Sequence, residues 1–415
     1  MRIDSVRIGS VRIGLAVGAT AALTACGSGG ATPLVLQGDL IPVPDGALTA
    51  ADVAGAQTAF GVDLLHAVCG TGPQDVLLSP TSAAEALGLL HPAAAAGTAG
   101  SMGAVLHLPR WSPDLVAATR DHSEALAGLR HDGDPDDEDA PDSLELSNHL
   151  WTAPGVRPDQ GYLDDLATAF DADLRALDFA GDPAGATDRI NSTVAEDTHD
   201  VIEELFGDPL SPATQVVLTN ALHLQARWAT PFTSTDPAPF AAPSGERDVP
   251  MMSGGSGTAR TAGGWRSVEL PYRDGTLSAV AVLPPEDVDP CAVDVPTLAA
   301  LQAAEPEDVG VRLPRLRLEQ THQLLEPLAD LGLPVSGDWP RLGAGDVEIS
   351  QVVQRTFLEV DEDGTEAAAA TGVAMSVSAR APLSVVSFDR PFLFLLTDTA
   401  TRSPLFVAAV HDPSV

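Results

Sequence analysis

The segment from Phe357 to Val377 limits the folds open to this chain more than any other stretch. Its first residues are mostly apolar and β-prone, and the turn residues 361–364 predict that this strand ends there. From Thr365 onward, alternate residues are small and then apolar, so an extended segment would have one face without bulky side chains near its start. Such a strand can fit between two existing strands, although an Ala-rich surface loop or a short helix also matches this composition. The face consists of Thr365, Ala367, Ala369, Thr371, Val373, Met375 and Val377.

The charge balance argues against a function in nucleic-acid binding. Its 415 residues carry 58 acidic and 22 basic side chains, a net charge of −36, and no lysine. Such a surface repels phosphates and anionic lipid headgroups. A hydrophobic share of 44% is sufficient for a large core. With three cysteines the chain is not a disulfide scaffold, and the sequence leaves open whether Cys69 and Cys291 pair.

The N-terminal residues 1–25 have the pattern of an export signal. A basic start precedes an apolar run, residues 13–23, that is too short to span a bilayer. The run ends in Leu-Thr-Ala-Cys, which resembles a bacterial lipobox and predicts lipidation of Cys26. An ordinary signal peptide with a chance cysteine is the alternative. Residues 26–48 are predicted to be a flexible linker, so we expect an exported protein that is lipid-anchored to the outer face of the bacterial membrane, or secreted.

Chemical motifs of enzymes are missing from the sequence. It has no nucleophile-elbow serine motif, no paired-histidine zinc motif and no phosphate-binding loop. Residues 131–142 are rich in carboxylates but lack the pattern of an EF-hand, so a solvated acidic loop is predicted there. We therefore expect no catalytic residues, no metal and no cofactor.

Several strand and helix patterns can be recognised in the rest of the chain. Residues 49–69 have the periodicity of an amphipathic helix, and residues 76–87 are predicted to be a short strand followed by a helix that starts at Ser-Pro. Residues 144–151 and 216–228 are predicted strands that carry embedded asparagines.

The segment around Thr365 resembles the reactive-loop hinge of the serpins, a family of serine protease inhibitors. The resemblance is carried by residues 362–371 and by the C-terminal segments 388–395 and 403–406. It extends to residues 216–232, whose matching positions are Asn220, Ala221, Trp228, Pro231 and Phe232.

This resemblance implies an α+β serpin fold for residues 49–415, with a large central mixed β-sheet, two smaller sheets, about eight to nine helices and an exposed reactive loop. It implies a monomeric suicide-substrate inhibitor of serine or cysteine proteases. The target protease cleaves the loop and forms an acyl-enzyme, and the loop then inserts into the central sheet and traps its partner. Elastase-, subtilisin- or trypsin-like proteases are the expected targets. The alternative is a non-inhibitory serpin that acts as a binding or carrier protein.

The resemblance also implies site residues. Counting from Glu362 places the reactive bond at Ser378–Ala379, with Arg380–Ala381 as the alternative. The expected hinge and inserting loop comprise Glu362, Gly364, Thr365, Glu366, Ala367, Ala368, Ala369, Ala370 and Thr371. The expected sheet-opening region comprises Ser79, Ser82, Asn191, Trp228 and Gln354, the last standing where many serpins have histidine.

Overall fold

The computed structural model describes residues 31–44, 46–70, 72–130, 141–343, 347–365 and 384–413. Within these ranges, the chain forms eight α-helices and the strands of two large β-sheets. The helices are α1 (Ala50–Cys69), α2 (Pro80–Gly88), α3 (Ala96–Val105), α4 (Pro113–Ala127), α5 (Gln160–Phe170), α6 (Pro183–Asp197), α7 (Val295–Ala303) and α8 (Leu325–Asp330).

The first sheet has eight strands, and seven of them follow the order β1-β4-β3-β5-β14-β13-β11, with β12 paired to β13. It is mixed, because β5 runs antiparallel to β3 but parallel to β13. Its strands are β1 (Leu34–Leu36), β3 (Ser143–Thr152), β4 (Leu174–Ala176), β5 (Val216–Arg227), β11 (Leu316–Gln323), β12 (Ser336–Gly337), β13 (Val347–Val360) and β14 (Gly364–Thr365).

The second sheet has nine strands in the order β15-β10-β7-β8-β9-β16-β17-β2, with β6 paired to β7. Its 18-residue strand β7 pairs with β6 and β10 along one part and with β8 near its end. The two smaller sheets expected from the sequence are therefore continuous through β7. The strands are β2 (Val76–Leu78), β6 (Ser234–Ala242), β7 (Gly245–Ala262), β8 (Trp265–Pro271), β9 (Leu277–Leu283), β10 (Glu307–Pro314), β15 (Val385–Ser387), β16 (Phe392–Asp398) and β17 (Pro404–Val410).

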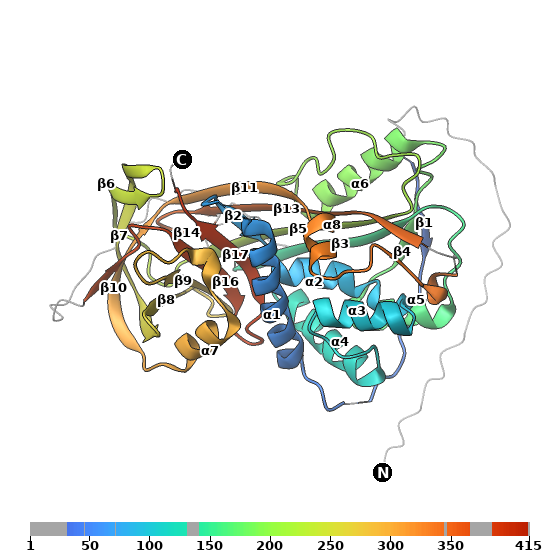
Figure 1. Ribbon diagram of the computed structural model, residues 1–415, viewed down its shortest axis with the longest axis horizontal. Helices are drawn as coiled ribbons and strands as arrows, with labels where there is room; N and C mark the ends of the chain where they lie inside the picture. The colour runs from blue at the N-terminus through green and yellow to red at the C-terminus, as the bar shows by residue number, and fades with distance from the viewer. Residues whose placement is uncertain are drawn as a thin grey trace, which may run out of the picture.

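The helices cover both faces of the first sheet. In Figure 1, α6 lies on one side of β3, β5 and β13, whereas α2, α3 and α4 lie on the other. Helix α1 begins at a reciprocal cap, in which the Thr49 hydroxyl and the Asp52 carboxylate each accept a backbone N–H of the other residue. Phe60 and Leu64 on its inner face are fully buried in the main core. The helix packs against α2, α4 and the second-sheet strands β17 and β2.

Part of the predicted linker, residues 26–48, belongs to the folded domain. Residues 34–36 form strand β1, which pairs antiparallel with β4 at the edge of the first sheet. Beyond it, the backbone N–H groups of Asp39 and Ile41 donate to side chains of α5. A three-residue strand carries too little periodicity to be recognised in a sequence. The chain is therefore fixed to the domain before residue 49.

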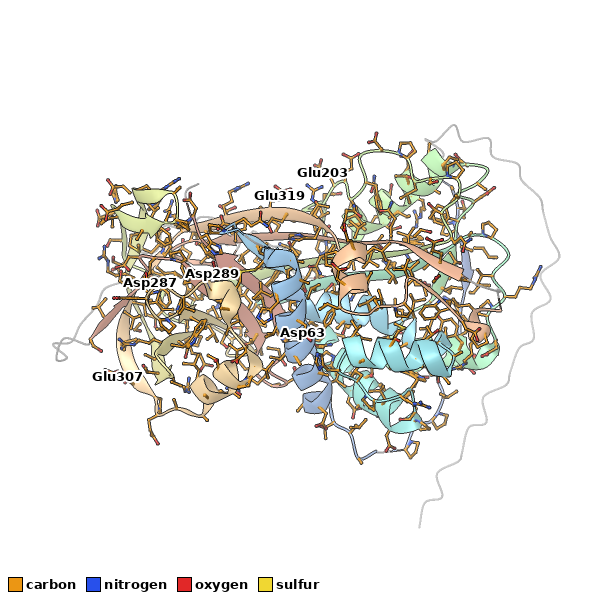
Figure 2. The ribbon with its side chains drawn as sticks, viewed as in Figure 1. Asp63, Glu203, Asp287, Asp289, Glu307 and Glu319 are labelled. Atoms are coloured by element: carbon orange, nitrogen blue, oxygen red, sulfur yellow. A yellow bond between two sulfur atoms is a disulfide. The ribbon has the colours of Figure 1, made fainter. Side chains whose placement is uncertain are left out.

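Acidic side chains lie around the outside of the molecule. The six that Figure 2 labels, from several different elements, are Asp63, Glu203, Asp287, Asp289, Glu307 and Glu319. Asp142 is an exception: it was expected in a solvated loop, yet it is 3% exposed and accepts the backbone N–H groups of Arg227 and Asp274. Among the described helices, none combines the length and the apolar composition needed to cross a bilayer.

Candidate functional site: a strand seam that opens at one end

The site is the seam between the parallel strands β5 and β13. The two strands pair directly from Val216 and Ile349 up to Leu222 and Thr356. Above this point they separate, and β14 lies between them, antiparallel to both. The first residues of the predicted inserting loop therefore already occupy the open end of the seam.

The turn that leads into β14 is held by backbone hydrogen bonds. The Asp361 carboxylate accepts the N–H groups of Asp363 at 2.9 Å and Gly364 at 3.1 Å. The backbone N–H groups of Trp228 and Phe232 donate to the carbonyls of Asp363 and Glu362, each at 2.9 Å. These bonds fix the path of the chain as it turns back into the sheet.

Gly364 is required where β14 approaches β5. A Cβ atom at this position would lie 2.1 Å from the carbonyl oxygen of Ala226, far inside van der Waals contact. Any other residue would push the two strands apart, so glycine is needed here for close approach and not for an unusual backbone angle.

Thr365 is the deepest described residue of the loop. It is 1% exposed, and its hydroxyl forms a hydrogen bond with that of Tyr272. Trp228 stacks on Tyr272 with ring centroids 4.4 Å apart, and its indole N–H donates to the carbonyl of Asp361 at 2.9 Å. Thr365 therefore occupies a closely packed, buried position beside Tyr272, which suits a small side chain and would desolvate a long charged one.

Glu362 connects the hinge to two neighbouring segments through its carboxylate. Both of its carboxylate oxygens accept hydrogen bonds from the Arg315 guanidinium at 2.6–3.1 Å, and it also accepts the hydroxyl of Thr235. Partial burial raises the pKa of Glu362, but the hydrogen bonds from Arg315 and Thr235 outweigh it and hold the net pKa below its usual value. The hinge glutamate is therefore ionised at neutral pH.

A second polar group lies lower in the seam, and we call it the amide cluster: Ser79, Ser82, Asn148, Asn220 and Gln354. The three amides stand in one register row across β3, β5 and β13. Gln354 is fully buried; its amide NH₂ donates to Ser79 O at 2.9 Å and Asn220 Oδ1 at 2.6 Å, and its Oε1 accepts the Ser79 N–H at 2.9 Å. Asn220 also donates to the Ser82 hydroxyl and to Asn148 Oδ1. The cluster thus joins three strands to the start of α2.

The predicted sheet-opening residues fall in three places. Ser79, Ser82 and Gln354 meet in the amide cluster, whereas Trp228 lies eight residues beyond Asn220 along the chain, roughly 26 Å further up the sheet. Asn191 is on α6 and takes no part in either group. Its amide bonds the backbone of Leu205 and Phe206, so it shapes the chain after α6.

The loop beyond Thr365 lies outside the described residues, as do both candidate reactive bonds and the proposed lipidation site. The predicted residues concerned are Cys26, Glu366, Ala367, Ala368, Ala369, Ala370, Thr371, Ser378, Ala379, Arg380 and Ala381.

Sequence reasoning missed four residues that shape this site: Thr235, Tyr272, Arg315 and Glu85. Tyr272 and Arg315 belong to strand motifs that had been recognised, but nothing in those motifs indicates which strand lies opposite Glu362 or Thr365. Glu85 was overlooked because a glutamate in a helix is ordinarily a surface residue.

Glu85 connects the amide cluster to a cavity of about 580 Å³ beside β3. One carboxylate oxygen accepts the Asn148 amide at 2.9 Å, and the other is buried without a hydrogen-bond partner, 3.7 Å from the ring of His122. Burial raises the pKa of Glu85 to about 7, and burial lowers the pKa of His122 to about 4. The two are therefore not an ion pair at neutral pH.

We predict that Glu85→Gln removes a pH dependence of stability. Because the folded pKa of Glu85, about 7, exceeds its ordinary value of 4.5, its stabilising contribution is complete below pH 4.5 and is lost as the pH rises through 7. At pH 8 the variant should be more stable than the parent by about 3 kcal/mol, with the two converging near pH 4.5. Thermal unfolding of both proteins from pH 5 to 8 measures this, and parallel profiles would contradict it.

Comparison with known proteins gives the same family throughout the domain. The family model described as "Serpin (serine protease inhibitor)" matches residues 55–413. A serpin-like protein of Thermococcus kodakarensis is 31% identical over 379 residues, which cover 87% of this chain and 86% of the relative. The leukocyte elastase inhibitor of Bos taurus is 30% identical over 392 residues, which cover 87% of this chain and 99% of the relative.

Solved structures agree with the fold. The thermophilic serpin tengpin, solved in its native state, superposes with a TM-score of 0.77 at 23% identity, covering 91% of this chain and 97% of tengpin. Human thyroxine-binding globulin gives a TM-score of 0.74 at 22% identity, covering 88% of this chain and 100% of the globulin. With a family model matching nearly the whole described domain, and a seam whose open end receives the start of a loop, this chain belongs to the serpin family.

Proposed function

We propose that this serpin is an inhibitor that traps its target protease by inserting its cleaved loop into the seam between β5 and β13. The observation that carries the proposal is the position of Gly364 and Thr365, which already form the first two residues of a strand between β5 and β13. The residues that follow directly, Ala367 and Ala369, continue the small-residue face, so nothing bulky opposes the first steps of further insertion.

The proposed insertion exchanges one kind of strand pairing for another. The inserting strand runs antiparallel to both neighbours, as β14 does, so a parallel pairing is replaced by two antiparallel ones, which are slightly more stable per residue. The segment from Thr365 to Ser378 spans roughly 46 Å when extended. This length carries a covalently attached protease along the sheet. The energy comes from new backbone hydrogen bonds and from burial of the small-residue face.

The reactive bond and the target class are part of the same proposal. Cleavage at Ser378–Ala379 fits elastase- or subtilisin-like proteases, because the residue before the bond is small. Cleavage at Arg380–Ala381 fits a trypsin-like protease. The protein is proposed to act outside the cell, exported by its N-terminal signal and held to the membrane by lipid on Cys26.

The test is incubation of residues 27–415 with elastase, subtilisin and trypsin, followed by denaturing electrophoresis and intact-mass measurement. A denaturant-resistant complex with a released C-terminal peptide supports inhibition, and the peptide begins at Ala379 or Ala381 according to the bond. Cleavage without a complex, and without a gain in thermal stability afterwards, would instead support the binding or carrier role.

A further inference from the structure

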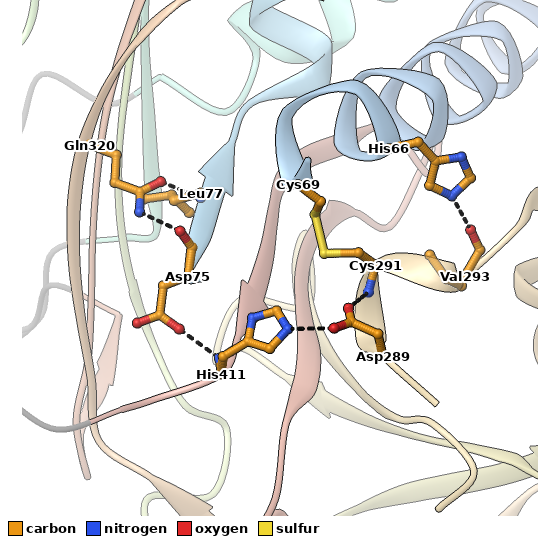
Figure 3. Close-up of a disulfide and its surroundings, with 9 residues drawn as sticks. All are labelled: His66, Cys69, Asp75, Leu77, Asp289, Cys291, Val293, Gln320 and His411. Atoms are coloured by element: carbon orange, nitrogen blue, oxygen red, sulfur yellow. Dashed lines mark hydrogen bonds and ion pairs between the residues drawn. A yellow bond between two sulfur atoms is a disulfide. The ribbon is translucent and has the colours of Figure 1, made fainter. Parts of the chain in front are cut away.

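A cluster of metal-ligating side chains lies outside the seam, around the Cys69–Cys291 disulfide. The two cysteines are 222 residues apart in sequence, with Cα atoms 6.4 Å apart. Cys69 ends α1, and Cys291 lies in the short helix η2 (Pro290–Ala292). Figure 3 shows that Asp289 and His411 reach the same place, the latter from the chain just after β17.

The carboxylate and the imidazole are already arranged as a pair of ligands. His411 Nε2 and Asp289 Oδ2 lie 3.1 Å apart. Two ligand atoms that share a tetrahedral zinc ion at its usual bond lengths are separated by roughly 3.3 Å. The Asp289 oxygen, the Cys291 sulfur and the His411 nitrogen lie within 4.8 Å of one another. A rotation of the freed cysteine side chain that moves its sulfur by about 1 Å would bring the sulfur to bonding distance of the ion.

The histidine of this cluster is buried and only partly hydrogen-bonded. His411 is 2% exposed, and its second ring nitrogen, Nδ1, is buried without a hydrogen-bond partner. Its backbone is fixed, because its N–H donates to the Asp75 carboxylate at 2.6 Å. Burial and the backbone bond therefore hold the imidazole in place beside Asp289.

The site is open to an ion from solvent. A cavity of about 390 Å³ lies against it, lined by both cysteines and Asp289 together with His66. Cys69 is the last residue of the 20-residue helix α1. The partial negative charge at the C-terminal end of a helix favours a cation there. The net charge of −36 raises the local concentration of cations further.

We propose that reduction of the Cys69–Cys291 disulfide creates a zinc site made of these two thiolates, His411 and Asp289. A dithiol reductant transfers two electrons to the disulfide, so that the sulfur–sulfur bond breaks, two thiols form and the reductant becomes a disulfide. One Zn²⁺ then binds both sulfurs and releases their two protons to water. Two thiolates with an imidazole and a carboxylate select zinc over calcium or magnesium, which prefer oxygen ligands only. The ion keeps α1 joined to η2 when the disulfide is absent.

The experiment uses the full chain with Cys26→Ser, which removes the third thiol, after reduction with a phosphine without oxygen. Co²⁺ is the probe, because bound thiolates give it a charge-transfer absorption in the near ultraviolet. The reduced chain should bind one equivalent with this absorption, Zn²⁺ should displace it, and the oxidised chain should bind neither ion.

Variants test the individual ligands. Cys291→Ser leaves one thiolate and should at least halve the intensity of the charge-transfer band, and His411→Asn should weaken Zn²⁺ binding at least tenfold. His66→Asn is the matched control: this residue lines the same cavity but bonds the Val293 carbonyl at 2.8 Å, so zinc affinity should not change. Reduced parent protein with both thiols alkylated serves where a variant fails to fold.

Three results would overturn the proposal. They are a reduced chain without the absorption, equal metal binding in the oxidised or alkylated chain, and equal loss of affinity in His66→Asn and His411→Asn.

Discussion

Replacing Thr365 with arginine should convert this serpin from an inhibitor into a substrate of the same protease. Thr365 is 1% exposed, in contact with Tyr272 and between two strands, so a guanidinium there loses its hydration without gaining a partner. Insertion then slows while hydrolysis of the acyl-enzyme continues at its own rate. We expect at least a tenfold rise in the number of serpin molecules consumed per protease inactivated.

The alternating pattern of the loop supplies a matched control for this result. Ala367→Arg places the same charge two residues along the same face and should have the same effect, whereas Ala368→Arg places it on the opposite face. Complex formation should therefore survive in Ala368→Arg and fail in the other two. Undiminished covalent complex in Thr365→Arg and Ala367→Arg would contradict the insertion mechanism. A loss in all three would show that the loop does not alternate as a strand.

Replacing Gln354 with alanine should open the seam without any protease. The change leaves two buried groups without these partners, namely the N–H of Ser79 and the Oδ1 of Asn220, while the Ser79 carbonyl still accepts the Ala83 N–H. Each such group costs about 1–3 kcal/mol when buried, so the direct pairing of β5 and β13 is weakened by at least about 2 kcal/mol. We expect inhibitory activity to decay at least tenfold faster on incubation at 37 °C, as the uncut loop enters the sheet.

Gln320 provides the control for Gln354. It is also a bridging glutamine, bonding the Leu77 N–H and the Asp75 carbonyl, but it lies on β11 and not at the seam. Gln320→Ala should lower stability without accelerating the loss of activity, and Gln354→His, which keeps a donor and an acceptor, should slow the decay again. Equal decay rates for the two alanine variants would show that the seam is not what Gln354 locks.

The sequence predicted the elements of this site better than it predicted their distances. The strand ending at Trp228 and the turn at 361–364 follow from local residue preferences, and both lie where the pattern put them. Trp228 and Gln354 were grouped in one region, yet they lie at different heights on the sheet, because a sequence motif carries no information on strand register. Asn191 was added to that region by resemblance alone and lies on a helix.

The disulfide illustrates the same limit. Two cysteines 222 residues apart meet only because α1 and η2 pack together in the finished fold. No local pattern around either residue encodes that meeting. Strand β1 is not predicted from the sequence for a different reason. Its pattern is local, but it is only three residues long.

Strand β1 has a consequence for how the proposed anchored form would be oriented. Through β4 and β3 it is aligned with Val216–Leu218 at one end of β5, whereas β14 pairs with Ala226 and Arg227 at the other end, roughly 30 Å away. Figure 1 shows β1 and β14 in opposite halves of the molecule. Leu34 is eight positions after Cys26, and this stretch of chain reaches at most roughly 28 Å. A bilayer attached at Cys26 would face the β1 end, so the end of the sheet at which β14 enters would face away from the membrane, toward proteases that approach the cell.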